Sequence, residues 1–159
     1  QIYVDQQAGP KIRAAAQGAC DDQMNMTSFY RKDISALSEI RLVATQLYAM
    51  AGVGPKDIQT AVLYDHFSPF VLPQLEAFDF CRRGEAKDFV QDGQIDMGGQ
   101  LPVNPHGGQL GEAYIHGVNG IAEGVRQVRG TSVNQVPSVR NVLVTAGTGV
   151  PTSGLILAG

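Results

Sequence analysis

The chain has 159 residues, the length of one typical domain. Hydrophobic residues make up 43% of it and charged residues 17%, a composition that excludes a disordered protein. The net charge is −3 and there is no basic block, which excludes charge-driven binding of nucleic acid or of an anionic membrane.

We expect this chain to be a piece of a longer protein. Residues 1–10 contain neither an initiator methionine nor the basic and apolar stretches of a signal peptide. No apolar run approaches the roughly 20 residues that span a bilayer. The chain also stops directly after an apolar run that is typical of a strand. Residues 1–10 are expected to be a linker, and residues 11–159 to form one domain.

A strand, a loop and a helix are predicted for the first third of the chain. Residues 11–19 indicate a short strand and residues 20–35 a polar loop. Residues 36–51 predict a helix, because apolar side chains recur there at three- and four-residue spacing. The apolar positions of this helix are Ile40, Val43, Leu47 and Met50. Gly52 and Pro55 are expected to end it.

The middle of the chain predicts a second strand and a second helix. Residues 60–63 form a short apolar run that favours a buried strand. Residues 68–83, with a proline near the start, predict a helix. Residues 84–103 are rich in glycine and aspartate and too irregular for an assignment.

A long helix is predicted over residues 109–129, with two distinct stripes. The apolar stripe consists of Leu110, Tyr114, Val118, Ile121, Val125 and Val128, and the small-residue stripe of Ala113, Gly117, Gly120 and Gly124. A glycine inside a helix costs roughly 1 kcal/mol relative to alanine. Three glycines on one stripe therefore imply that another backbone packs closely there, and we expect this helix to be buried at the centre of the fold.

The last two strands, residues 141–145 and 154–158, are expected to form an antiparallel hairpin around a Gly/Pro loop. The complete order is strand, helix, strand, helix, helix, strand, strand. This alternation predicts an α/β fold with a mostly parallel sheet and helices on its faces.

The first candidate site follows the strand at residues 60–63. Tyr64, Asp65 and His66 form an ionisable triplet at its carboxyl end, where α/β sheets bind their ligands. Alternatively, Tyr64 and His66 are polar groups whose hydrogen bonds are satisfied at a strand end.

The second candidate site is the turn before the long helix, which contains Asn104, His106, Gly107 and Gly108. A Gly-rich turn at a helix N-terminus presents backbone N–H groups and partial positive charge to an anionic oxygen. The pattern matches neither a P-loop nor a dinucleotide-binding fingerprint. The alternative is that the glycines serve only the conformation of the turn.

The third candidate site is on the long helix itself. Glu112, His116 and Asn119 would share one side of it, next to Tyr114. Tyr114 is alternatively a core tyrosine whose hydroxyl is satisfied. Glu112 and His116 lack a third ligand, so we expect no metal.

Two cysteines complete the set of reactive side chains. Cys20 and Cys81 stand in no metal-binding or redox spacing, which favours reduced thiols in a cytoplasmic protein.

The segment NPHGGQLGEAYIHGVNG resembles the thiolase signature, an Asn-x-x-Gly-Gly segment followed by Gly-His-Pro-x-Gly. Asn104, Gly107, Gly108 and Gly117 occupy the family positions, and Ala113-Tyr114-Ile115 replaces Gly-His-Pro.

An upstream motif resembles the same family. Tyr64-Asp65-His66-Phe67 stands where thiolases have Asn-Glu-Ala-Phe, or His-Asp-Cys-Phe in the sterol-carrier-protein type. The stretch FCRRGEAKDFVQDGQIDMGGQLPVN also resembles that branch, and the similarity extends from about residue 11 to the end. The resemblance implies a thiolase-like C-terminal half, with a mixed four- to five-stranded sheet and helices on both faces. It also implies an N-terminal half as partner, and a homodimer.

The departures from the thiolase pattern bear on the chemistry. Tyr64 and Tyr114 replace the residues that hold the thioester oxyanion in thiolases. The loop AGTGVPTSG lacks the second thiolase cysteine, and the nucleophilic cysteine belongs to the N-terminal half. Ordinary thiolysis is therefore not expected.

A tyrosine pair at these positions resembles the lipid-transfer-protein aldolases of steroid side-chain breakdown. The resemblance implies retro-aldol cleavage of a β-hydroxyacyl-CoA into a ketone and a shorter acyl-CoA. Tyr64 and Tyr114 would transfer protons together with His66. A phenol has an unperturbed pKa near 10 and needs nearby positive charge or hydrogen-bond donors to act as a base. His66, His106 or His116 would supply them.

The remaining roles are also implied by the resemblance. The substrate-binding residues would be Asn104, His106, Gly107, Gly108 and His116. The CoA thioester is the substrate and no cofactor is expected. An OB-fold acyl-CoA-binding protein is the implied additional partner.

Two other functions stay open. The first is a sterol-carrier-type acyl-CoA acyltransferase, which a nucleophilic cysteine in the missing half would favour. The second is a non-catalytic thiolase-fold scaffold, which a native protein of only 159 residues without a partner half would favour.

Overall fold

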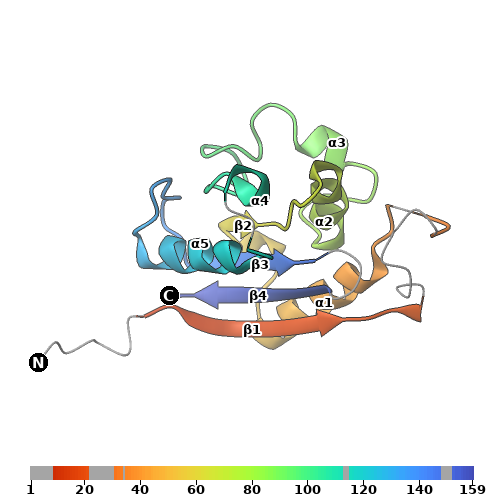
Figure 1. The fold of residues 1–159 in the computed structure, drawn as a ribbon, viewed down its shortest axis with the longest axis horizontal. Helices are drawn as coiled ribbons and strands as arrows, with labels where there is room; N and C mark the ends of the chain where they lie inside the picture. Colours follow the sequence, from red (N-terminus) through yellow and green to blue (C-terminus); the bar gives the residue numbers. More distant parts are fainter. Residues whose placement is uncertain (1–8, 22–30, 34, 113–114, 148–151) are drawn as a thin grey trace, which may run out of the picture.

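A four-stranded sheet with the strand order β1-β4-β3-β2 lies at the centre of the computed structural model (Figure 1). The structure describes residues 9–21, 31–33, 35–112, 115–147 and 152–159. The strands are β1 (Lys11–Gly18), β2 (Thr60–Val62), β3 (Asn141–Ala146) and β4 (Thr152–Ala158). All four strands predicted from the sequence are confirmed.

The sheet is mixed, as the thiolase resemblance implied. β4 runs antiparallel to both β1 and β3, and only β2 and β3 are parallel. The expectation of a mostly parallel sheet is therefore wrong. Alternation of strands and helices predicts parallel strands, because a helix returns the chain to the same edge of the sheet. The β3–β4 hairpin has no such helix, and β4 lies antiparallel between β3 and β1.

Two helices cover opposite faces of the sheet, α1 (Ser38–Ala51) and α5 (Val118–Arg129) (Figure 1). Neighbouring side chains of a strand point to opposite faces. Leu143 and Ile156 accordingly pack in the α1 core, whereas Val144 and Leu157 pack in the α5 core.

Helix α1 confirms most of its sequence prediction. Ile40, Val43 and Leu47 are buried, and Gly52 ends the helix in the left-handed conformation, φ 62°. Met50, placed on the same face by its spacing, is 55% exposed, so that assignment is wrong. Ala51 is the buried residue of this last turn instead.

The predicted helix over residues 68–83 is shorter in the structure. A 3-10 turn, Ser68–Phe70, leads into α2 (Val71–Ala77). Asp79 then adopts φ 58°, and the Phe80 N–H donates to the Leu75 carbonyl at 3.0 Å. The left-handed conformation of Asp79 ends the helix, and the closing turn places the Phe80 ring 6.5 Å from the buried Phe78 ring. A further 3-10 turn, Pro55–Asp57, precedes β2, and α3 (Ala86–Phe89) lies in the irregular stretch.

The long helix predicted over residues 109–129 is wrong. The structure has a single turn, α4 (Gly108–Gly111), and then α5. His116 and Gly117 have φ values of 48° and 90°, which no right-handed helix accommodates. The predicted positions Ala113 and Tyr114 lie outside the described residues.

The small stripe of α5 does pack closely, but against side chains of the sheet and not against another backbone. A Cβ on Gly120 would lie 3.1 Å from Val62, and one on Gly124 would lie 2.8 Å from both Val144 and Leu157. The predicted apolar stripe is divided: Val125 and Val128 are partly buried against the sheet core, whereas its N-terminal members are exposed. The exposed fractions of these members are 62% for Leu110, 58% for Val118 and 37% for Ile121.

Other expectations concern membranes and cysteines. None of the helices in the described ranges has the length and hydropathy to cross a bilayer. Cys20 and Cys81 are both thiols, partly buried.

Candidate active site

The carboxyl end of β2 is held by the side chain of Asn104. The segment preceding Asn104 runs beside β2, where Ala61 and Val103 form a parallel bridge. Asn104, with φ 50°, then pairs its amide with Leu63: Oδ1 accepts from the Leu63 N–H at 2.7 Å and Nδ2 donates to the Leu63 carbonyl at 3.0 Å. The side-chain amide of Asn104 thus makes the pair of hydrogen bonds that a neighbouring strand would make with the Leu63 backbone. Asn104 as a substrate-binding residue stays a prediction.

Side chains from two other elements hold the backbone of Tyr64. Its N–H donates to Thr145 Oγ1 at 2.9 Å, and its carbonyl accepts from Gln74 Nε2 at 2.7 Å. Thr145 Oγ1 in turn donates to Gln74 Oε1 at 2.6 Å. Sequence reasoning missed Gln74 and Thr145. A threonine within the apolar run of residues 142–146 and a glutamine within residues 71–78 were the available signals.

Tyr64 is 7% exposed, and its ring belongs to an aromatic cluster around His66. The His66 ring contacts Tyr64 at a centroid distance of 4.9 Å, with the planes tilted by 39°, and Phe70 at 5.3 Å, nearly parallel. On another side of Tyr64, a Cβ on Gly117 would lie 3.5 Å from the ring. Tyr64 and His66 thus meet at the end of β2, as predicted.

His66 is electrostatically suited to be neutral. Its burial lowers its pKa below the ordinary value of 6.5, and the charge of Asp65 opposes this shift. A neutral imidazole offers one hydrogen-bond donor and one acceptor at pH 7. The nearby positive charge expected from a histidine is therefore not supplied by His66 at this pH.

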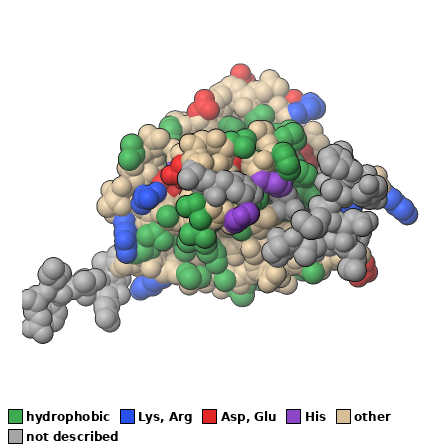
Figure 2. Space-filling model, in the orientation of Figure 1, with side chains coloured by type: hydrophobic (Ala, Val, Ile, Leu, Met, Phe, Trp, Pro, Cys, Tyr) green, Lys and Arg blue, Asp and Glu red, His purple; other side chains and the backbone are tan. Residues whose placement is uncertain are grey.

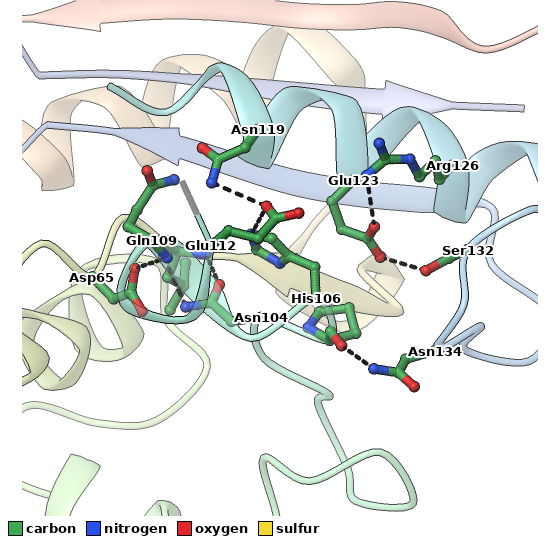
Figure 3. Close-up of polar contacts among 12 residues, drawn as sticks. Asp65, Asn104, His106, Gln109, Glu112, Asn119, Glu123, Arg126, Ser132 and Asn134 are labelled. Carbon is green, nitrogen blue, oxygen red and sulfur yellow. Dashed lines mark hydrogen bonds and ion pairs between the residues drawn. The ribbon is translucent and has the colours of Figure 1, made fainter. Parts of the chain in front are cut away.

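The Gly107–Gly108 turn binds an anionic group of this same chain. The Gln109 N–H donates to Asp65 Oδ1 at 2.7 Å (Figure 3). Gly107 and Gly108 have φ values of 99° and 73°. The long-helix dipole that motivated this prediction is absent, because α4 has four residues. Substrate binding by the two glycines stays a prediction.

His106, Glu112 and Asn119 form a polar cluster beside this turn (Figure 3). Asn119 Nδ2 donates to Glu112 Oε2 at 3.1 Å, and His106 Nε2 lies 3.9 Å from the same oxygen. The His106 side chain is 4% exposed. The proposed Glu112/His116/Asn119 side of one helix is wrong, since the helix is interrupted and His116 is exposed. Within the described ranges, no three potential metal ligands gather.

A buried network on α5 supports the turn from below. Glu123 Oε1 accepts from Gln127 Nε2 at 2.8 Å and from Ser132 Oγ at 2.7 Å. Gln127 Nε2 also donates to the Asn134 carbonyl, and Asn134 Nδ2 donates to the Pro105 carbonyl, both at 2.7 Å. The chain segment next to His106 is thereby anchored to α5 (Figure 3).

The strand-end motif and the Gly-Gly turn both lie within the part of the chain that matches a known protein family. Residues 19–157 match the family described as thiolase C-terminal domain-like. The chain belongs to this family. The resemblance inferred from its motifs is therefore confirmed.

Two curated relatives of this thiolase C-terminal-like domain share 67% identity with it over 146 residues, or 92% of the chain. One is the 17-hydroxy-3-oxo-4-pregnene-20-carboxyl-CoA lyase of Mycobacterium tuberculosis, and the other is the steroid side-chain-cleaving aldolase of Thermomonospora curvata. The chain spans 38% and 37% of their respective lengths.

Two solved structures resemble the domain. One is named Ltp2-ChsH2(DUF35) aldolase and has a TM-score of 0.91 and 65% identity, covering 94% of this chain and 39% of that one. The other is a monomeric SCP2-thiolase-like protein of Mycobacterium smegmatis, with a TM-score of 0.62 and 22% identity, covering 94% of this chain and 29% of that one. The second similarity shows the fold alone.

Proposed function

We propose that the protein containing this domain cleaves a β-hydroxyacyl-CoA by a retro-aldol reaction, with a steroid side chain as the acyl group. The observation that carries this proposal is 67% identity, over 92% of the chain, to two proteins named as a lyase and an aldolase for such substrates. The presence of Tyr64 at the end of β2, in place of the thiolase residue, supports it.

The name of the first relative defines the chemistry. In a 20-carboxyl-CoA, C20 is α to the thioester, so the 17-hydroxyl is on the β-carbon. A base removes the hydroxyl proton, the C17–O bond becomes a carbonyl, and the C17–C20 bond breaks. Its electron pair passes into the thioester as an enolate, and an acid then protonates C20. The products are a 17-ketosteroid and a three-carbon acyl-CoA. The reaction balances without a redox step, so we propose no cofactor beside the CoA ester.

Tyr64 is proposed as one of the two proton-transfer groups. Its backbone is held at both polar atoms, and its ring packs against the His66 ring. Since burial favours neutral His66, this side chain is proposed to act by hydrogen bonding and not by charge. Tyr114 is proposed as the second group because it occupies a thiolase motif position. Asn104, His106, Gly107, Gly108 and His116 are the proposed substrate-binding residues.

The rest of the protein is proposed to cover the outward face of α4 and α5. Hydrophobic side chains gather over α5 in Figure 2, and the exposed fractions reach 62% at Leu110 and 58% at Val118. An exposed apolar cluster of this kind marks an interaction surface. We propose an N-terminal thiolase half as its occupant, a homodimer as the assembly and a cytoplasmic location. The solved relative named Ltp2-ChsH2(DUF35) joins two components, which supports a further partner protein, proposed to be an OB-fold acyl-CoA-binding protein.

An acyltransferase is the second candidate function, since a benzoylsuccinyl-CoA thiolase subunit of Thauera aromatica is 35% identical over 123 residues. The cysteine-free loop between β3 and β4 argues against it.

The deciding experiment uses the full-length protein with its partners. 17-Hydroxy-3-oxo-4-pregnene-20-carboxyl-CoA is supplied, and the steroid ketone and the acyl-CoA are measured by chromatography and mass spectrometry. We expect both products, and a loss of roughly 10²–10⁴-fold in turnover in Tyr64→Phe, which removes only a hydroxyl. Thiolysis of a 3-ketoacyl-CoA by free CoA, without aldol cleavage, would establish the acyltransferase instead.

A further inference from the structure

The Tyr64 backbone lies just beyond the last ladder pair of β2. Val62 pairs with Val144 in the parallel ladder, and there the backbone pairing ends. Tyr64 N–H donates to the side chain of Thr145, which is 5% exposed. The position of Tyr64 therefore depends on a hydroxyl of β3 and not on sheet hydrogen bonds alone.

Gln74 of α2 completes the arrangement from the other side. Its side chain is fully buried, and its Oε1 accepts the Thr145 hydroxyl at 2.6 Å. Its Nε2 donates to the carbonyls of Tyr64, at 2.7 Å, and Phe70, at 2.9 Å. All hydrogen-bonding capacity of the Nε2 group is used, so the orientation of this amide is set.

The two carbonyls bound by Gln74 belong to Tyr64 and Phe70. The rings of both residues contact the His66 ring. One buried amide thus connects the backbones of two residues that contact His66, and Thr145 connects the same amide to the sheet.

We propose that Gln74 and Thr145 are positioning residues that hold Tyr64 and the His66 ring in register for proton transfer. This inference rests on the proposed function, because it concerns the orientation of Tyr64 toward a substrate. Misplacement of a reacting group by about 1 Å can cost roughly 10²-fold in rate. Since neither residue is assigned a contact with substrate, its loss should lower kcat and leave KM unchanged.

The test compares Thr145→Val and Gln74→Met with the wild-type full-length protein. Thr145→Val keeps the shape of the side chain and removes the hydroxyl. We expect kcat to fall by about 10- to 100-fold in each variant, with KM unaltered. Thr145→Ser should restore kcat, because it restores the hydroxyl. If Gln74→Met does not fold, Thr145→Val carries the test, with Thr145→Ser as its matched rescue.

The double variant examines whether the two residues act as one unit. Residues of one hydrogen-bond network show non-additive effects. The double variant should therefore have about the same kcat as the single variant with the lower kcat. Losses that multiply would overturn a shared role.

Thr60→Val is the matched control. Thr60 is also buried, and its hydroxyl donates one hydrogen bond, to the Pro102 carbonyl at 2.7 Å, at the opposite end of β2. We expect it to lower stability without changing kcat. A similar loss of kcat in Thr60→Val would attribute the effect to general destabilisation and overturn the proposal.

Hydrogen exchange separates this inference from the proposed reaction. In Thr145→Val the Tyr64 amide loses its acceptor and should exchange faster, whatever the activity of the protein. Faster exchange in a protein without aldolase turnover would support the inference that Thr145 holds the Tyr64 backbone, and it would reject the aldolase function. Wild-type kinetics in Thr145→Val and Gln74→Met, in an active aldolase, would reject the positioning role.

Discussion

The contact between Asp65 and the turn before α4 can be tested by replacing Gly108 with alanine. Gly108 has φ 73°, a conformation that side chains other than glycine rarely adopt. A Cβ at this position would overlap Asp65 Oδ2 and lie 2.8 Å from Asp65 Cγ. The same carboxylate accepts the Gln109 N–H at 2.7 Å. One methyl group therefore forces either the turn or Asp65 to move.

The expected loss of stability follows from these two contacts. The left-handed backbone costs an alanine about 1–2 kcal/mol. Losing the charge-assisted hydrogen bond from Gln109 to Asp65 costs about 1.5–3 kcal/mol. Together they lower the free energy of unfolding by about 3–5 kcal/mol, out of the 5–15 kcal/mol typical of a protein. The first full-length relative has roughly 380 residues, since 146 residues are 38% of it, so about 1.2 °C per kcal/mol applies and the Tm should fall by roughly 4–6 °C.

The assay is thermal unfolding of the full-length protein, followed by circular dichroism. Gly52→Ala is the control, since Gly52 has φ 62° and no heavy atom of the described residues lies within 4 Å of its Cβ position. This control should show only the backbone cost, about 1–2 kcal/mol. The double variant Asp65→Ala/Gly108→Ala should lose less than the sum of the two single variants, because the overlap is relieved. A Gly108→Ala protein no less stable than Gly52→Ala would refute this reasoning.

Three further predictions concern charge and reactivity. Burial lowers the folded-state pKa of His66 below 6.5, so its contribution to stability is intact above pH 6.5 and declines as the pH falls below that value. Urea unfolding across this range should show a shallower decline in His66→Phe, and an equal slope would contradict the assignment. Arg31 and Glu39 form a buried ion pair at 2.9 Å. Arg31→Met should cost about 3–5 kcal/mol in chemical denaturation, whereas Arg31→Met/Glu39→Leu should recover much of that loss. Burial, aided by neighbouring carboxylates, raises the pKa of Cys81 to about 11. Its reaction with a disulfide reagent at pH 8 should therefore be at least roughly tenfold slower than that of a free thiol, and a normal rate would exclude this shift.

The location of the candidate site could be predicted from the sequence, whereas its supports could not. An ionisable triplet after an apolar run marks the carboxyl end of β2 from residue types alone. Gln74 and Thr145 are far from Tyr64 along the chain, and only folding brings their polar atoms to its backbone. A single buried glutamine or threonine in a sequence does not reveal its partner.

Local chemistry determined several elements of this protein by itself. The spacing of Ile40, Val43 and Leu47, with Gly52 after them, was enough to define α1, because helix periodicity and a left-handed C-cap are local properties. The motif around Asn104 and Gly108 likewise identified the thiolase family from residue types and their order.

The tertiary structure alone decided where the long helical pattern breaks. Residues 109–129 have helical periodicity, yet Gly117 has φ 90° and packs against the Tyr64 ring. A Cβ on Gly124 would lie only 2.8 Å from Val144 and Leu157, so the glycine side of α5 faces the sheet and Val118 faces outward. The physical reason is that the valine and leucine side chains of the sheet leave no room for a Cβ at Gly120 or Gly124, so the glycines face the sheet while Val125 and Val128 pack at their side. That choice depends on the shape of the sheet, which residues distant in the sequence create.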